Sequence, residues 1–216
     1  MTTLNDAGGD LRNRYLNDPC GTLANAYWKE NWFSKPDGLI IVHESELTKN
    51  EAHNGMRYFR LIHHMENMSL PCLLQGFSFR KPTLPDEAGI VADFINRCYE
   101  GYAQTGENVL RWTDYPVYDA DLWIFAWDKS ADKPAALGIA DFDKKIGEGS
   151  LEWIQTLPHY RGKGIGQAIV LELLARLTGR AKFVTVSGEK HNKSNPEGLY
   201  RKCGFVGSDV WVVISA

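Results

Sequence analysis

A glycine-rich turn, Arg161–Gly166, constrains this chain more than any other segment. It follows a strand-like run that ends near Leu157 and precedes apolar residues at the three- and four-residue spacings of a helix. Glycines let the backbone turn tightly, and the first turn of a helix has amide N–H groups without intrahelical partners. The helix dipole and the basic side chains of Arg161 and Lys163 add positive charge. The turn therefore predicts an anion site suited to a diphosphate.

Two common phosphate-binding patterns do not fit this turn. The Walker pattern needs a Lys followed by Ser or Thr after the last glycine, whereas Lys163 precedes Gly164. The dinucleotide fingerprint needs Gly-x-Gly-x-x-Gly in a parallel βαβ unit, whereas Gly162, Gly164 and Gly166 are spaced by two and follow an apparent antiparallel meander. Taken alone, the motif also allows a turn that serves packing only.

The order of elements from residue 76 onward predicts an α/β (α+β) fold with a mixed, mostly antiparallel sheet flanked by helices. The order is strand, helix, three strands, helix, strand, helix, strand. Short polar turns between the three consecutive strands indicate a meander. The predicted strands are Gly76–Arg80, Leu122–Trp127, Ala136–Phe142, Leu151–Leu157, Phe183–Val186 and Val210–Ile214, and the predicted helices begin near Asp86, Gly164 and Asn195.

The first third of the chain is predicted to be ordered but shows no recognisable chemistry. Residues 1–20 are polar, and the extreme N-terminus is expected to be loosely ordered. Leu39–Val42 reads as a strand, and Tyr58–Ile62 as a further strand or a short helix. Aromatic residues could line an acceptor pocket, but such clusters more often form a packing seam. They are Tyr27, Trp28, Trp32 and Phe33.

Length and composition bound the class of protein. The 216 residues allow one domain with a substantial extension, and we predict an extension over 1–75 packed on a main domain over 76–216. The scattered basic residues and the formal net charge of −3 argue against a nucleic-acid partner or an anionic membrane. No apolar run approaches the roughly 18 residues that span a bilayer, and no signal pattern opens the chain. A cytoplasmic location is expected.

Neither a metal site nor a disulfide framework is expected. The four cysteines lie far apart and form no Cys-x-x-Cys pair. His63 and His64 are adjacent, so their side chains point in different directions. We therefore expect reduced, mostly packed thiols and no metal.

Two motifs resemble the GNAT N-acetyltransferase superfamily. The stretch Gln155–Gly166 resembles the family's acetyl-CoA signature, Gln/Arg-x-x-Gly-x-Gly/Ala, through Arg161, Gly164 and Gly166. The stretch Leu199–Phe205 resembles the leucine-tyrosine, basic pair, glycine-phenylalanine end of the family's penultimate helix. The two motifs occur in the family's order. The resemblance covers about residues 76–216, and the order of elements matches the family fold.

The resemblance implies acetyl-CoA as cosubstrate. In the family, amides of the glycine-rich turn hold the pyrophosphate, and the preceding strand pairs with the pantetheine arm in a slot where it splays from the next strand. That strand has a bulge in the family, here expected near Gln155 or Leu157, with a backbone N–H for the oxyanion. Asn192 is an alternative to Asn195 for pantetheine, and Asn195 is equally well explained as a helix cap. The residues implied in cofactor binding are Gln155, Thr156, Leu157, Arg161, Gly162, Lys163, Gly164, Ile165, Gly166 and Asn195.

Catalytic roles follow from the same resemblance. By analogy Tyr200 donates a proton to the CoA sulfur, although a buried Tyr on an amphipathic helix is also explained by packing alone. Glu152 is the leading candidate for the base that deprotonates the amine, directly or through water, and Asp141 and Asp143 on the preceding strand compete with it.

The predicted function is transfer of an acetyl group from acetyl-CoA to a primary amine of a small molecule or a polypeptide. The alternative is a non-catalytic acyl-CoA-binding or sensing module, and a nucleotide-binding protein is a third hypothesis. The expected partners are acetyl-CoA and an amine acceptor, with no nucleic acid or membrane. A homodimer is an open alternative to a monomer.

Overall fold

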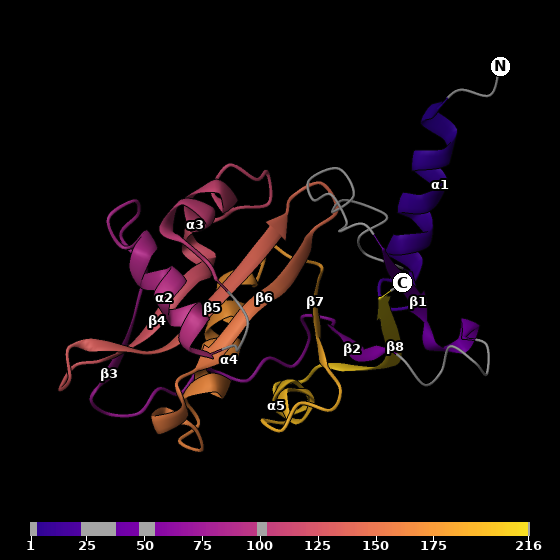
Figure 1. Cartoon of the computed structure of the whole chain (residues 1–216). Coiled ribbons are helices and arrows are strands. Elements are labelled where there is room, and N and C mark those ends of the chain that lie inside the picture. The colour runs from indigo at the N-terminus through magenta and orange to yellow at the C-terminus, as the bar shows by residue number, and fades with distance from the viewer. Residues whose placement is uncertain (1–3, 23–37, 48–54, 99–102, 216) are drawn as a thin grey trace. The chain divides into compact units, whose positions relative to one another are not determined.

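Figure 1 shows the computed structural model of the chain. It describes residues 4–22, 38–47, 55–98 and 103–215. The chain forms two compact units, which we call the smaller and the larger unit. The smaller unit comprises Met1–His63, Thr185–Gly198 and Phe205–Ala216, and the larger unit comprises His64–Val184 and Leu199–Gly204. The predicted boundary at residue 75, between an extension and a main domain, stays a prediction.

An antiparallel meander forms the centre of the larger unit. Its strands are β3 (Phe77–Arg80), β4 (Trp123–Asp128), β5 (Lys133–Asp143) and β6 (Glu148–Thr156). Each pairs antiparallel with the next, and β7 (Phe183–Glu189), which is divided between the two units, follows β6 in the strand order. The predicted meander is confirmed.

Helices lie on both faces of this sheet. Helix α2 (Ala88–Cys98) places Phe94 against Phe125 of β4, with ring centroids 6.1 Å apart. Helix α3 (Gly106–Trp112) follows α2 on the same face, and α4 (Ile165–Leu177) covers the other face (Figure 1). Short helical turns η4 (Ala120–Leu122) and η5 (Pro158–Tyr160) precede β4 and follow β6. Helix α5 (Pro196–Lys202) begins in the smaller unit and continues in the larger one.

Two glycines allow α4 to approach the sheet closely. A Cβ at Gly138 of β5 would lie 2.4 Å from Cγ2 of Ile169, and a Cβ at Gly149 of β6 would lie 2.6 Å from Cδ1 of Leu177. A side chain at either position would force Ile169 or Leu177 to shift, so glycine at these positions lets α4 lie close to the strands. Ile169 and Leu177 are both fully buried there.

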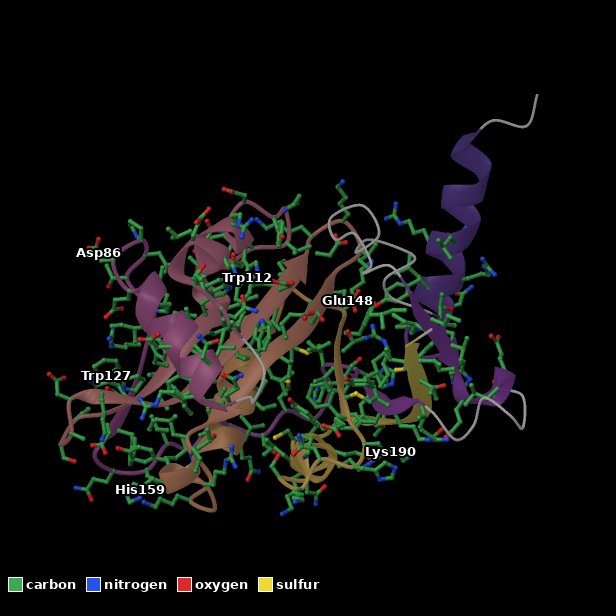
Figure 2. All side chains as sticks on the ribbon, viewed as in Figure 1. Asp86, Trp112, Trp127, Glu148, His159 and Lys190 are labelled. Carbon is green, nitrogen blue, oxygen red and sulfur yellow. The ribbon has the colours of Figure 1, made fainter. Side chains whose placement is uncertain are left out.

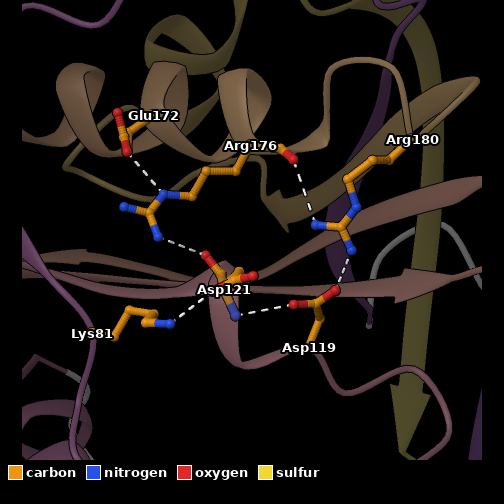
Figure 3. A network of polar contacts seen from close by, with 6 residues as sticks. All are labelled: Lys81, Asp119, Asp121, Glu172, Arg176 and Arg180. Carbon is orange, nitrogen blue, oxygen red and sulfur yellow. Dashed lines mark hydrogen bonds and ion pairs between the residues drawn. The ribbon is translucent and has the colours of Figure 1, made fainter.

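A polar network holds the C-terminal half of α4 to the segment before β4 (Figure 3). Arg176 donates to Glu172 and to the carbonyl oxygen of Asp121, each at 2.8 Å. Asp121 also accepts from Lys81 at 2.7 Å. Arg180, which follows α4, pairs with Asp119. The far end of α4 is therefore fixed, which leaves its N-terminus in a defined position beside the end of β6.

The smaller unit contains a second set of antiparallel strands. Its strands β1 (Leu39–His43), β8 (Val206–Ser215) and β2 (Met56–His63) are neighbours in that order, and β7 follows β2. The short turn η3 (Glu44–Glu46) follows β1. The prediction of strands near residues 39–42 and 58–62 is confirmed.

The expectation of a loosely ordered N-terminus is wrong, because α1 covers Leu4–Asn17. Its Tyr15 is fully buried, and the hydroxyl accepts a hydrogen bond from Arg60 at 2.8 Å. Arg60 also donates to the carbonyl oxygen of Pro19 and to Ser187. One buried guanidinium thus fixes a segment whose own composition is polar. The aromatic residues between Tyr27 and Phe33 lie outside the described residues.

The fold class predicted from the sequence is confirmed: the described strands and helices form a mixed, mostly antiparallel sheet flanked by helices. Among the described residues, no helix has both the length and the apolar character required to cross a bilayer.

Substitution of Gly138 by Ala tests the close approach of α4. We expect Gly138→Ala to lower the free energy of unfolding by about 1–3 kcal/mol, because its Cβ overlaps Ile169. Gly89→Ala on α2 is the matched control, since no atom lies within 4 Å of its Cβ position and Ala favours helix. We expect that control to be neutral or to raise stability by up to about 1 kcal/mol. Urea unfolding measures the free energy of unfolding of each variant. An equal change in the two variants would contradict the packing argument.

Candidate active site

The glycine-rich turn presents an open backbone at the start of α4. Gly162 and Gly164 have φ angles of 75° and 78°, and no atom lies within 4 Å of the Cβ position at either glycine. Residues other than glycine rarely adopt this left-handed backbone conformation. Gly164 is the N-cap of α4 and supplies no side-chain hydrogen bond to the first turn. The helix therefore begins without the usual cap, and its first amides are free to bind an anion.

The two motifs recognised in the sequence meet at Gly166. A Cβ at this position would lie 3.2 Å from Oγ1 of Thr156 and 3.6 Å from Cδ2 of Leu199. Thr156 ends β6, Gly166 lies in the first turn of α4, and Leu199 precedes Tyr200 on α5. The larger unit thus brings the end of β6, the glycine-rich turn and the Tyr200 helix into contact. Tyr200 itself is 6% exposed.

The segment between β6 and the turn is anchored by Tyr160. Its buried hydroxyl donates to Asp128 at 2.8 Å, and Ser130 donates to the same carboxylate at 2.7 Å. Hydrogen bonds from Ser130 and Tyr160 hold the pKa of Asp128 well below its usual range. Arg161 Nε donates to the carbonyl oxygen of Thr156 at 3.0 Å. The start of the predicted anion-binding segment is therefore held in place.

The basic side chains of the turn are exposed, and Ile165 anchors its last part. Lys163 Nζ lies 5.4 Å from the centre of the Tyr160 ring. Ile165 is 1% exposed and serves the core, so any contribution to a ligand comes from its backbone. Arg161 and Lys163 remain at the surface, where they add positive charge beside the helix N-terminus.

The bulge of strand β6 lies at Glu152, not near Gln155 or Leu157. Leu151 pairs with Ala140 and Trp153 with Ile139, which leaves Glu152 as the extra residue of a bulge. The expected position near Gln155 or Leu157 is not where the register shifts, and the amide of Leu157 donates to Ala135 at 3.1 Å. A bulge leaves one residue outside the ladder and turns its side chain.

The carboxylate of Glu152 lies beside Ser150, whose hydroxyl donates to it at 2.7 Å. Glu152 is partly exposed, and Ser150 is buried. The competing Asp143 accepts from the backbone amide of Lys145 at 2.8 Å, so it stabilises the turn after β5. Asp141 pairs in register with Ser150. Of the three predicted candidates for a base, Glu152 is the one that lies at the bulge of β6.

The side chain of Gln155 is buried without a hydrogen-bonding partner. It is 5% exposed, and neither Nε2 nor Oε1 is paired. An unsatisfied buried polar group costs about 1–3 kcal/mol, so such groups are rare in folded proteins. The sequence motif pointed to this residue through its backbone, but the state of the side chain becomes visible only in the structure.

The two asparagines make local hydrogen bonds in the smaller unit. Asn195 Oδ1 accepts from the amide of Gly198 at 3.0 Å, which confirms its role as a cap of α5. Asn192 Oδ1 accepts from Ser194. Contact of either side chain with pantetheine stays a prediction.

A wall of tryptophans near Glu152 was not predicted from the sequence. Trp153 of β6 stacks on Trp112 of α3, with ring centroids 5.8 Å apart and an angle of 13° (Trp112 is labelled in Figure 2). Trp112 also contacts Trp123 edge to face at 6.2 Å. The signal available in the sequence was Trp153 beside Glu152. Trp112 is 41 residues away, so only the fold joins the two.

Neither the two cysteines with shifted pKa values nor a cluster of metal ligands is indicated as part of the site in the described residues. Burial raises the pKa of Cys203 to about 11, which disfavours a thiolate. Burial also raises the pKa of Cys98. Within the described ranges, no group of three or more His, Cys, Asp or Glu side chains is arranged to hold a metal ion.

Comparison with known proteins finds a family model that matches part of the chain. Residues 119–207 match the acetyltransferase (GNAT) domain. That range includes β4 to β6, the glycine-rich turn, α4 and Tyr200. No curated protein matches the sequence.

Solved structures with the same fold are distant in sequence. A GCN5-related N-acetyltransferase from Sphaerobacter thermophilus has 17% identity and a TM-score of 0.65 over 94% of this chain and 68% of its own. A tandem GNAT protein from the clavulanic acid biosynthesis pathway has 12% identity and a TM-score of 0.60, covering 82% and 63%. An acetyltransferase of the GNAT family from Colwellia psychrerythraea has 14% identity and a TM-score of 0.58, covering 81% and 64%.

The chain therefore has the GNAT fold, and its residues 119–207 match the GNAT acetyltransferase domain. The resemblance predicted from the glycine-rich turn and the Tyr200 helix is confirmed. The family supports acyl transfer as the class of reaction.

Removal of the Tyr160 hydroxyl tests the anchor of the turn. We expect Tyr160→Phe to lower the melting temperature by about 2–5 °C at neutral pH, because Asp128 loses a charge-assisted hydrogen bond. The pKa of Asp128 is lowered in the folded state, so this stabilisation is complete above its ordinary value of 3.8 and is lost as the pH falls through the folded value. The free energies of unfolding from urea titration should differ from wild type by the same amount at pH 7 and pH 5, because both values lie above the ordinary pKa of Asp128. A difference that grows with acidity would contradict the assignment.

Proposed function

We propose that this protein is an N-acetyltransferase that transfers an acetyl group from acetyl-CoA to a primary amine. The observation that carries the proposal is the start of α4, where an uncapped helix N-terminus meets two open glycines and two exposed basic residues, Arg161 and Lys163. This arrangement fits a diphosphate. The same unit brings Tyr200 and the bulged strand to that end of the fold, which a turn serving packing alone does not require.

The charge and the open backbone of the turn support a site for the diphosphate of acetyl-CoA. The backbone from Arg161 to Gly166 would hold the pyrophosphate, because no side chain fills the space at Gly162 or Gly164. The end of β6, from Gln155 to Leu157, would pair with the pantetheine arm. When bound, the cosubstrate supplies the activated acetyl group as a thioester.

The chain's own side chains would then move two protons. The Glu152 carboxylate would accept a proton from the ammonium form of the acceptor, which frees the nitrogen lone pair for attack. A backbone N–H at the bulge would donate a hydrogen bond to the developing oxyanion. Tyr200 would give its hydroxyl proton to the departing thiolate, and the proton that the nitrogen loses as the amide forms would restore the phenol. The new bond joins the amine nitrogen to the acetyl carbon, and the bond that breaks is the thioester C–S bond.

Thiol release with a panel of amines tests turnover. We expect acetyl-CoA and at least one primary amine to give CoA, and Tyr200→Phe to lower kcat by about 100-fold or more with little change in KM for acetyl-CoA. Tyr118→Phe is the matched control, because it removes a tyrosine hydroxyl from a residue outside the proposed machinery. Acetyl-CoA binding without thiol release on any amine would instead identify a non-catalytic binding module.

A charge placed in the turn tests the cofactor site separately. We expect Gly164→Glu to weaken acetyl-CoA binding about tenfold or more, because it places a carboxylate at the helix N-terminus. Gly179→Glu is the matched control: Gly179 has a φ of 74° and equally open surroundings, but it follows the other end of α4. Calorimetric titration should show the control within about threefold of wild type. Equal weakening by both variants would contradict the site.

A further inference from the structure

The side chain of Gln155 requires an explanation that the protein itself does not supply. It is 5% exposed, yet both ends of its carboxamide are unpaired. Buried polar side chains in folded proteins are hydrogen-bonded with few exceptions, and each exception needs a reason. A carboxamide can donate through Nε2 and accept through Oε1. It therefore points to a group from outside the chain that both donates and accepts.

The register of the sheet shows which face Gln155 occupies. Gly138 faces α4, because its Cβ position lies against Ile169 of that helix. Ile154 pairs with Gly138 and so faces α4 too, as does Thr156 two residues later, close to Gly166. Gln155 lies between Ile154 and Thr156 in a regular stretch of the strand. Its side chain therefore points to the opposite face, which α2 and α3 cover.

That face is apolar around Gln155 in the cross-strand direction. Gln155 pairs with Leu137, and Leu137 pairs with Phe125, both fully buried. Phe94 of α2 packs on Phe125. None of these side chains can hydrogen-bond a carboxamide.

Along the strand the same face becomes polar and aromatic. Trp153, two residues before Gln155, stacks on Trp112. The carboxylate of Glu152 follows at the bulge. A cationic amine is attracted by both a carboxylate and a tryptophan ring. Because a strand rises about 3.3 Å per residue, Glu152 and Gln155 are close enough for one small molecule to reach both side chains.

We propose that Gln155 selects the acceptor by hydrogen bonding to a hydroxyl or carboxamide group on the amine substrate. This inference rests on the proposed function and names the substrate class of that site: a polar amine whose nitrogen lies toward Glu152 and whose second polar group meets Gln155. A site with a buried hydrogen-bonding group rejects an analogue that lacks the matching group, because the protein group is then left unpaired. Gln155 is thus a specificity-determining residue.

Matched pairs of amines test this selection. Ethanolamine and propylamine differ by a hydroxyl in place of a methyl group, and glycinamide and isobutylamine differ by a carboxamide in place of an isopropyl group. We expect wild type to prefer the polar member of at least one pair by about 100-fold in kcat/KM. Gln155→Met keeps the length of the side chain without its hydrogen bonds, and we expect it to reduce that preference at least tenfold.

A packing control and a stability readout separate selection from a structural role. Leu137→Met repacks the neighbouring position and should leave the preference unchanged. Gln155→Met should also raise the melting temperature of the free protein by about 2–6 °C, because it removes two unsatisfied buried groups. A lower melting temperature with an unchanged preference would show a carboxamide satisfied by water in the free protein, and would overturn the inference.

The two proposals fail at different points of this experiment. If wild-type protein releases no CoA with any amine, the proposed function fails, and the inference fails with it. If wild type acetylates amines but shows no preference for the polar members, or if Gln155→Met keeps the wild-type preference, only the inference fails.

Discussion

The close approach of α4 to the sheet is the constraint on which the candidate site depends. Gly138 and Gly149 leave room for Ile169 and Leu177, and the salt-bridge network around Arg176 fixes the far end of the helix. With its length and its far end fixed, α4 must begin beside the last residues of β6. The position of the uncapped N-terminus is thus a consequence of how the rest of α4 packs on the sheet.

Much of the candidate site could be predicted from the sequence because its chemistry is local. Glycines that adopt positive φ and a helix that begins directly after them are adjacent in the chain, so Gly162 and Gly164 could be assigned an anion-binding role before the fold was known. The meander was predictable for the same reason, since short polar turns join neighbouring strands. The polar N-terminus was not, because Arg60, far along the chain, supplies the hydrogen bond that anchors Tyr15.

Other features depend on register and on pairs distant in the sequence. The bulge at Glu152 follows from how β6 pairs with β5, which composition alone does not determine. The stacking of Trp112 on Trp153 joins two elements on one face of the sheet. The unpaired state of Gln155 depends on the apolar row formed by Leu137 and its neighbours. In each case a residue type was visible in the sequence, but its surroundings were not.

The central claim is that the start of α4 binds the diphosphate of acetyl-CoA, and amide NMR tests it most directly. Titration of ¹⁵N-labelled protein with acetyl-CoA should shift the amide resonances of Gly162, Gly164 and Gly166 along a single saturating curve. The amide of Gly179, beyond the other end of the helix, should not follow that curve. Saturable binding that leaves the three glycine amides unchanged, or no binding at millimolar acetyl-CoA, would contradict the account.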